Sequence, residues 1–194
     1  MIICVPNEEV RGDVFTANIY VSAFRNYYII LKTILEVIMT QLVRTELIEL
    51  NLKARERKDA IIELTGRLEQ QGYLFSKDGF LQDVFQREEI GNTAVGFGVA
   101  IPHGKSPEVK QTAIVYGRSE LGIDWESVDE EPVHSVFLLA VPEEKASNEH
   151  LRILALLSRA LINEDFRQQL LEAATSEEIS ELLNEVTQQK VIES

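Results

Sequence analysis

The stretch Ser135-Val-Phe-Leu-Leu-Ala-Val141 decides the fold, because six apolar residues follow one another without interruption. A strand with one face in solvent alternates apolar and polar residues, whereas a strand buried on both faces is apolar throughout. Strands of the second kind occur in sheets that carry helices on both sides. We therefore expect Ser135–Val141 to be a central strand of an α/β protein.

The sequence before this strand predicts its neighbours in the sheet. Val95–Ile101 and Thr112–Arg118 are apolar-rich segments of strand length, and Leu47–Leu50 alternates apolar and polar residues. Two helices are expected between the strands at Leu47–Leu50 and Val95–Ile101. One covers residues 56–71, with Gly72 at its C-terminal cap, and the other covers 77–87 and starts after Ser76. The apolar face of the first helix consists of Ile61, Leu64, Thr65 and Leu68.

The C-terminal third is predicted to be helical. A stripe of apolar and small residues at i, i+3 and i+4 spacing predicts a helix that Asn163 ends, and another helix begins there. Thr175-Ser-Glu-Glu178 is a capping box that opens the last helix. This order of elements predicts a three-layer α/β/α sandwich with a mixed central sheet. The stripe consists of Leu151, Leu154, Ala155, Ser158, Leu161 and Ile162.

Charge and cysteine content exclude several classes of function. The chain has 194 residues, of which 45% are hydrophobic and 26% charged, and its formal net charge is −13. Nucleic acids and acidic membranes bind basic surfaces, so this charge argues against nonspecific binding to either. The single cysteine, Cys4, cannot form an intramolecular disulfide, which fits a reducing compartment.

The first 38 residues differ from the rest. Arg25, Lys32 and Glu36 interrupt the apolar residues of 14–38, and no run reaches the roughly 18 apolar residues of a membrane span. No convincing cleavage site follows, so we expect neither membrane insertion nor a secretory signal. The clear domain pattern begins just after Met39. Our hypothesis is that residues 1–38 are an upstream extension, from a misplaced start codon, and that 39–194 form the working domain. The intact mass of the protein from its native host tests this hypothesis.

The densest special sequence is Gly91-Asn-Thr-Ala-Val-Gly-Phe-Gly-Val-Ala-Ile-Pro-His-Gly104, which holds four of the ten glycines. Within it an apolar strand ends, Pro102 removes the next ladder donor, and His103 follows beside a permissive glycine. Strand ends in α/β proteins are where reactive groups are usually displayed. The residues alone leave two interpretations of His103 open: a functional group, or a structural histidine of a turn.

Three segments in order resemble a known family. Arg87-Glu88, Thr93 and Gly96-Phe-Gly-Val-Ala-Ile-Pro-His-Gly104 are similar to the active-site signature of the fructose/mannitol-class enzyme IIA domains (EIIA type 2) of the bacterial phosphotransferase system. His150, in Asn148-Glu-His-Leu-Arg-Ile-Leu-Ala-Leu-Leu-Ser158, resembles that family's second active-site histidine. The resemblance covers about residues 42–186.

The resemblance implies a cytoplasmic phosphoryl relay that needs no cofactor. Such a domain accepts a phosphoryl group from the carrier protein HPr on the histidine that matches His103. It then passes the group to an EIIB domain, which phosphorylates a sugar during uptake through an EIIC membrane component. Nitrogen-related members of the family use the same histidine to control which proteins they bind. The site residues leave this choice open, together with the identity of the sugar and the choice between monomer and homodimer.

Elementary chemistry agrees with these roles. A neutral imidazole is a good nucleophile at about pH 7. A phosphoryl group on its nitrogen remains easy to transfer, as a reversible relay requires. Arg87 offers a cationic fork for phosphoryl oxygens. His150 is expected in the first turn of a helix capped by Ser147, where the positive end of the helix dipole favours a neutral ring and attracts phosphate. Thr93 is expected to add a hydroxyl contact to the phosphate.

Structural interpretations exist for the same residues. Arg87 is also a candidate for a surface ion pair with Glu88 or Glu89, and His150 for a surface residue of a capping region. A metal shared by His103 and His150 is not expected, because no closely spaced third ligand accompanies them. Two further residues are interpreted as structural. His134, just before the central strand, is expected at a strand edge, and Trp125 is expected to pack over a turn.

Overall fold

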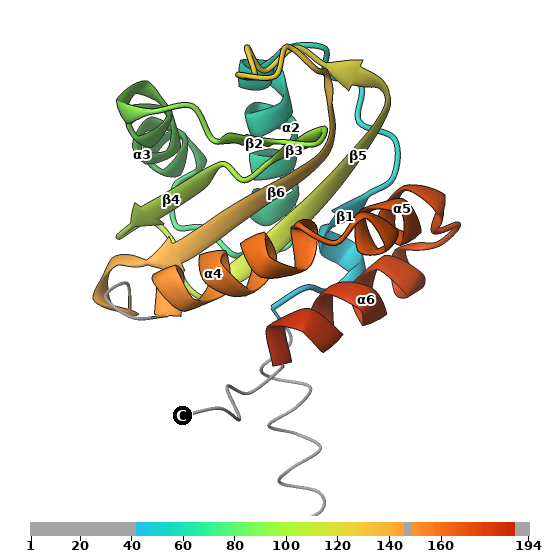
Figure 1. Ribbon diagram of the computed structural model, residues 1–194. Coiled ribbons are helices and arrows are strands. Elements are labelled where there is room, and N and C mark those ends of the chain that lie inside the picture. Colours follow the sequence, from blue (N-terminus) through green and yellow to red (C-terminus); the bar gives the residue numbers. More distant parts are fainter. Residues whose placement is uncertain (1–41, 146–148, 189–194) are drawn as a thin grey trace, which may run out of the picture. The chain divides into compact units, whose positions relative to one another are not determined.

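The computed structural model describes residues 42–145 and 149–188 (Figure 1). The extension hypothesised for residues 1–38 lies outside the described residues, and so does Ser147, the expected helix cap. Within the described part of the chain, no helix is long and apolar enough to cross a membrane.

A six-stranded mixed sheet forms the middle layer of the domain. Its strand order is β1-β5-β6-β3-β2, and β4 pairs with β6 beyond the end of β3. Strand β6 runs parallel to β3 and β4 and antiparallel to β5. The strands are β1 (Ile48–Glu49), β2 (Ala94–Gly96), β3 (Val99–Ala100), β4 (His103–Ser106), β5 (Ala113–Ile123) and β6 (Val133–Pro142).

The predicted central strand is confirmed. Alternate residues of the apolar run Val136–Val141 in β6 face two separate hydrophobic cores, one on each side of the sheet. All six residues of this run are fully buried. Burial on both faces is the reason that this segment is apolar at every position. Val136, Leu138 and Ala140 belong to one core, and Phe137, Leu139 and Val141 belong to the other.

Helices cover both faces of the sheet, as predicted (Figure 1). Two helices pack on the first core and three on the second, which gives the expected three-layer α/β/α sandwich. The first group is α2 (Arg57–Gln70) and α3 (Lys77–Ile90), and the second is α4 (Glu149–Leu161), α5 (Glu164–Glu172) and α6 (Ser176–Gln188). Short 3₁₀ turns lie at η1 (Thr45–Leu47) and η2 (Glu143–Lys145).

The predicted C-terminal end of α2 and the predicted start of α3 are confirmed. Gly72 has a φ of +75° after α2, and its N–H and that of Tyr73 close a Schellman motif on the carbonyl oxygens of Glu69 and Leu68. Ser76 caps α3 by accepting a hydrogen bond from the N–H of Gly79. Helix α3 continues three residues beyond the predicted end, to Ile90.

The predicted stripe of α4 is only partly the buried face. Leu161 is buried and Leu154 packs partly on the core, whereas Leu151 and Ile162 are 64% and 74% exposed. Ile153 and Leu157, which the stripe leaves out, are buried in the core. Apolar residues occur on almost every side of this helix, so the spacing fitted more than one face. The next helix boundaries are as expected, because Asn163 caps α5 and Thr175 accepts a hydrogen bond from the N–H of Glu178.

The single strand predicted over Val95–Ile101 was also wrong. The segment is a tight β2–β3 hairpin, because Gly96, Phe97 and Gly98 all have positive φ angles of 84°, 57° and 69° and reverse the chain. His103 therefore does not follow the end of one long strand but begins β4, opposite Leu139 of β6. The predicted strand over Leu47–Leu50 is shorter as well, since only Ile48–Glu49 pairs with β5.

Candidate phosphoryl-transfer site

The close packing of α3 on β4 brings the predicted site residues together. A Cβ atom added to Gly104 would lie 2.7 Å from side-chain carbons of both Phe80 and Val84 of α3. Gly104 is therefore required for space, and the left-handed conformation expected of a permissive glycine is not used there. Phe80, Val84 and Arg87 share one face of α3 at i, i+4 and i+7 spacing, so this contact directs Arg87 towards His103.

Hydrogen bonds fix both nitrogens of His103. Nδ1 lies 2.9 Å from the carbonyl oxygen of Ile101, which can only accept, so Nδ1 carries the ring proton. Nε2 consequently holds a lone pair, and it accepts a hydrogen bond of 2.9 Å from Nε of Arg87. A second donor of Arg87, Nη1, binds the carbonyl oxygen of Gly91 at 2.9 Å and holds the guanidinium in place. The nitrogen of His103 that can act as a nucleophile is therefore Nε2.

The surroundings keep His103 neutral. The side chain is almost buried, at 8% exposure, and this burial is the main cause that lowers the pKa of His103 below 6.5. The charge of Arg87 lowers the same pKa further, whereas the bond to Ile101 and the charge of Glu88 act in the opposite direction. A neutral ring with a free lone pair is the form that can attack phosphorus.

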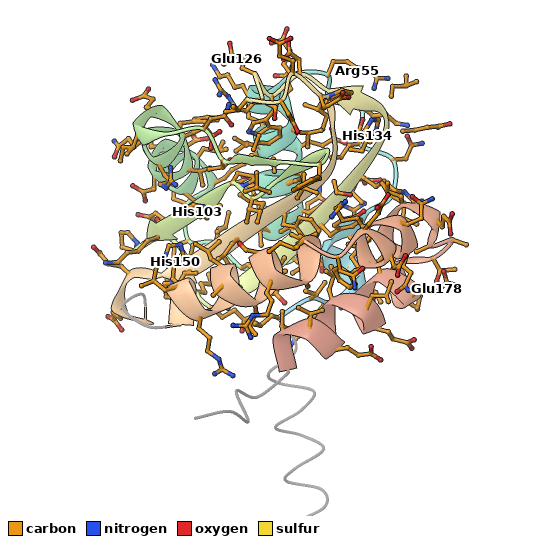
Figure 2. The ribbon with its side chains drawn as sticks, in the orientation of Figure 1. Arg55, His103, Glu126, His134, His150 and Glu178 are labelled. Atoms are coloured by element: carbon orange, nitrogen blue, oxygen red, sulfur yellow. The ribbon has the colours of Figure 1, made fainter. Side chains whose placement is uncertain are left out.

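His150 lies against His103. The two ring centroids are 5.0 Å apart at a tilt of 48°, and His150 lies in the first turn of α4, as predicted (Figure 2). Burial lowers the pKa of His150, and the nearby His103, Arg87 and Lys105 lower it further. Its Nε2 is buried and has no hydrogen-bond partner among the described residues. An unpartnered polar atom beside the nucleophile is suited to a group that arrives with its own oxygens.

Thr93 is engaged elsewhere. Its hydroxyl donates to Oε2 of Glu88 at 2.7 Å, and its N–H donates to Oε1 of the same carboxylate at 3.1 Å. The hydroxyl proton is therefore not available to a phosphoryl group on His103. Glu88, which the sequence offers as part of the Arg87-Glu88 signature and as an ion-pair partner for Arg87, is instead a buried residue. The pattern that marks it as buried is the recurrence of Phe80, Val84 and Glu88 at every fourth residue of α3.

The structure also tests the structural interpretations of Arg87, His134 and Trp125. Arg87 forms no ion pair with a described acidic residue and donates to His103 and Gly91 instead. His134 lies inside β6, not before it, and binds the carbonyl oxygen of Ser119 at 2.9 Å at the other end of the sheet from His103 (Figure 2). Trp125 is 1% exposed and donates its indole N–H to Glu88 at 3.1 Å, so it is a core residue.

The chain is similar to proteins of a known family. Residues 41–186 match the family model of the phosphoenolpyruvate-dependent sugar phosphotransferase system, EIIA 2. The chain belongs to this family. The expectation drawn from Arg87, His103 and His150 is therefore confirmed at the level of the family, and the protein is a component of the EIIA type of that system.

Relatives of two kinds resemble this EIIA chain. It is 37% identical over 147 residues to the "PTS system fructose-specific EIIABC component" of Bacillus subtilis, which covers 76% of this chain and 23% of that protein. The chain thus spans less than a quarter of that relative's length. It is 35% identical over 143 residues to the "PTS system fructose-specific EIIA component" of Haloferax volcanii, which covers 74% of this chain and 92% of that protein. It is also 40% identical over 133 residues to the "Nitrogen regulatory protein" of Bradyrhizobium diazoefficiens, covering 68% and 85%.

The solved structures that resemble this chain also include a nitrogen regulatory protein and a sugar-specific enzyme IIA. The nitrogen regulatory protein IIA-Ntr of Neisseria meningitidis has a TM-score of 0.69 and 29% identity, covering 75% of this chain and 99% of that one. The mannitol enzyme IIA of Escherichia coli, in complex with phosphorylated enzyme IIB, has a TM-score of 0.62 and 25% identity, covering 73% and 96%.

Proposed function

We propose that this EIIA domain is a phosphocarrier that accepts a phosphoryl group on Nε2 of His103 and passes it to an EIIB domain during sugar uptake. The observation that supports this most directly is the pair of hydrogen bonds on the ring, which leaves the Nε2 lone pair as the nucleophile. A complex of a similar enzyme IIA with a phosphorylated enzyme IIB supports EIIB as the acceptor. We infer HPr, a protein that carries phosphohistidine, as the donor.

The transfer step needs no proton to move on His103. The Nε2 lone pair forms a bond to phosphorus, the P–N bond of the donor histidine breaks, and its electron pair returns to the donor ring. The Nδ1 proton remains on its bond to Ile101 throughout. In the second step a nucleophile of EIIB bonds to phosphorus, the P–Nε2 bond of His103 breaks, and its electron pair returns to the His103 ring. Positioning and charge stabilisation therefore supply most of the catalysis.

Arg87 and His150 act on the phosphoryl oxygens. When phosphorus binds Nε2, the Nε–H of Arg87 loses its acceptor and becomes available to an adjacent oxygen. Nη1 keeps its bond to Gly91, so the guanidinium is held in place during this exchange. The unpartnered Nε2 of His150 gains a partner if it carries the ring proton of the neutral form. Thr93 is not included in this proposed site, because its hydroxyl is bound to Glu88.

Radioactive phosphoenolpyruvate, with enzyme I and HPr, tests the proposal. We expect a label on the protein that is acid-labile and base-stable, as phosphohistidine is. His103→Ala should remove the label, with His134→Ala as the matched control because His134 lies at the other end of the sheet. Full labelling of folded His103→Ala would refute the assignment of the site.

A second function is favoured by the nitrogen regulatory relatives. They are as similar to this chain as the transport relatives, at 40% identity in sequence and a TM-score of 0.69 in structure. In such a role the phosphorylation of His103 would change which proteins the domain binds. Transfer of the label from the phosphorylated domain to purified EIIB domains separates the two functions: rapid loss of label to one of them supports transport, and retention with all of them supports regulation.

A further inference from the structure

A buried carboxylate next to Arg87 gathers hydrogen-bond donors from two parts of the chain and a positive charge from a third. Glu88 is 8% exposed, and its Oε1 accepts from the N–H of Thr93 and the indole N–H of Trp125, both at 3.1 Å. Its Oε2 accepts from the Thr93 hydroxyl at 2.7 Å. A guanidinium nitrogen of Arg57 lies 3.9 Å from Oε1. A buried charge is tolerated only where donors and an opposite charge surround it, and Glu88 has both.

The same carboxylate is connected to the ring of His103 through the backbone. The Thr93 carbonyl oxygen accepts a hydrogen bond of 3.0 Å from the N–H of Ile101. The Ile101 carbonyl oxygen in turn holds Nδ1 of His103 at 2.9 Å. The group that fixes the tautomer of His103 is thus placed by Thr93, and Thr93 is placed by Glu88.

Glu88 also fixes the helix end that carries Arg87. The two residues are neighbours in the last turn of α3, one directed to the core and the other to His103. Asn92 adds to the anchoring, because its amide nitrogen donates to the carbonyl oxygens of Trp125 and Glu126 at 2.9 and 2.8 Å. The end of α3 and the loop after it are therefore tied to the turn that contains Trp125.

We propose that Glu88 is a positioning residue that holds both hydrogen-bond partners of His103, the Arg87 guanidinium and the Ile101 carbonyl, in the arrangement required for transfer. This role rests on the phosphocarrier function proposed above. Glu88 touches neither the ring of His103 nor the incoming phosphoryl group, and it acts only through Thr93, Ile101 and the α3 backbone.

Two substitutions of Glu88 separate position from charge. In Glu88→Gln the amide oxygen takes the place of Oε1 and keeps the bonds from Thr93 N–H and Trp125, and the Thr93 hydroxyl turns to accept from the amide nitrogen. The network survives without its charge, so the labelling rate should stay within roughly a factor of five of the wild type. Glu88→Ala leaves the donors of Thr93 and Trp125 without an acceptor, and labelling should slow on the order of 100-fold. Glu89→Ala is the matched control, because Glu89 is the exposed next residue.

The tautomer of His103 gives a readout that a merely structural role would leave unchanged. ¹⁵N chemical shifts of the unphosphorylated ring should report the Nδ1–H form in the wild type, Glu88→Gln and Glu89→Ala, and a mixture of tautomers in Glu88→Ala. If Glu88→Ala does not fold, Thr93→Val removes one bond of the network and should populate the second tautomer to a smaller extent.

The outcomes distinguish this inference from the proposed function. A folded Glu88→Ala protein with the wild-type tautomer and labelling rate would overturn the positioning role, and so would a Glu88→Gln protein as slow as Glu88→Ala. If Glu88→Ala does not fold, an unchanged tautomer in Thr93→Val overturns it. A wild-type protein that takes no label on His103 would instead overturn the phosphocarrier function, while the tautomer comparison would still test the network.

Discussion

Replacement of Arg87 by alanine tests whether its contact with His103 serves transfer. Arg87 binds Nε2 of His103 before phosphorylation, so it stabilises the free site as well as the phosphorylated one. Only the difference between these two interactions changes the rate of transfer. Both bonds have a charged donor, so the bond to the neutral imidazole is worth about 1.5 kcal/mol and the bond to a charged phosphoryl oxygen up to about 3 kcal/mol.

The difference of about 1.5 kcal/mol corresponds to a rate about 10-fold slower in Arg87→Ala. The assay is the initial rate of labelling from phosphorylated HPr, measured by rapid quench at saturating donor. Arg87→Lys keeps the charge but cannot reach His103 and Gly91 together, so its labelling rate should lie between the rates of the wild type and Arg87→Ala. Arg152→Ala is the control, since it removes an exposed positive charge two residues from His150.

A folded Arg87→Ala protein with the wild-type rate would refute the reasoning, because the phosphoryl group would then gain nothing from the guanidinium. A faster rate would be equally decisive. It would mean that Arg87 mainly occupies the lone pair of His103 and holds back the attack.

Three further outcomes follow from the same geometry. His150→Ala should slow labelling roughly tenfold and leave the fold intact by circular dichroism, because Nε2 has no hydrogen-bond partner to lose among the residues that the structure describes. Gly104→Ala should destabilise the domain by about 1–3 kcal/mol in urea unfolding, since the new Cβ lies 2.7 Å from Phe80 and Val84 carbons. Burial lowers the pKa of both His103 and His150 below 6.5, so the unfolded chain binds more protons just below that pH. The free energy of unfolding should therefore fall as the pH drops below about 6.5, and it should fall less in a His103→Gln, His150→Gln double variant; equal losses would contradict the lowered pKa values of the two histidines.

The layers of the fold could be predicted from the sequence because single segments carry the information. Six consecutive apolar residues in β6 specify burial on both faces, and Gly72 and Ser76 mark helix ends by local chemistry alone. Predictions that needed the tertiary context failed. The spacing of apolar residues in α4 allowed several faces, and the chain reversal at Phe97 depends on a positive φ that a phenylalanine seldom adopts.

The sequence predicts which residues form the site, but it does not predict the hydrogen bonds that join them. Arg87, His103 and His150 were selected through a family signature, and the structure brings all three together. The bond from Nδ1 to Ile101 depends on a backbone carbonyl, which has no signature in the residue type. The contact between Thr93 and Glu88 was missed for a related reason: a hydroxyl near a phosphate signature suggests a ligand contact, whereas a buried carboxylate in the fold needs the same donor.

The free form of the site suits the phosphorylated state that we propose. Nε2 of His150 is buried without a hydrogen-bond partner among residues 42–145 and 149–188, and a phosphoryl oxygen would satisfy it. Phosphorylation also adds a charge of about −1.5 to −2 beside Arg87, in a chain whose net charge is already −13. Both effects follow from the site itself, and a transport component and a regulatory protein would share them. The two functions differ in what approaches His103 afterwards, because a regulator keeps the phosphoryl group and a transport component loses it to EIIB. The lifetime of the label in the presence of EIIB is therefore the quantity that separates them.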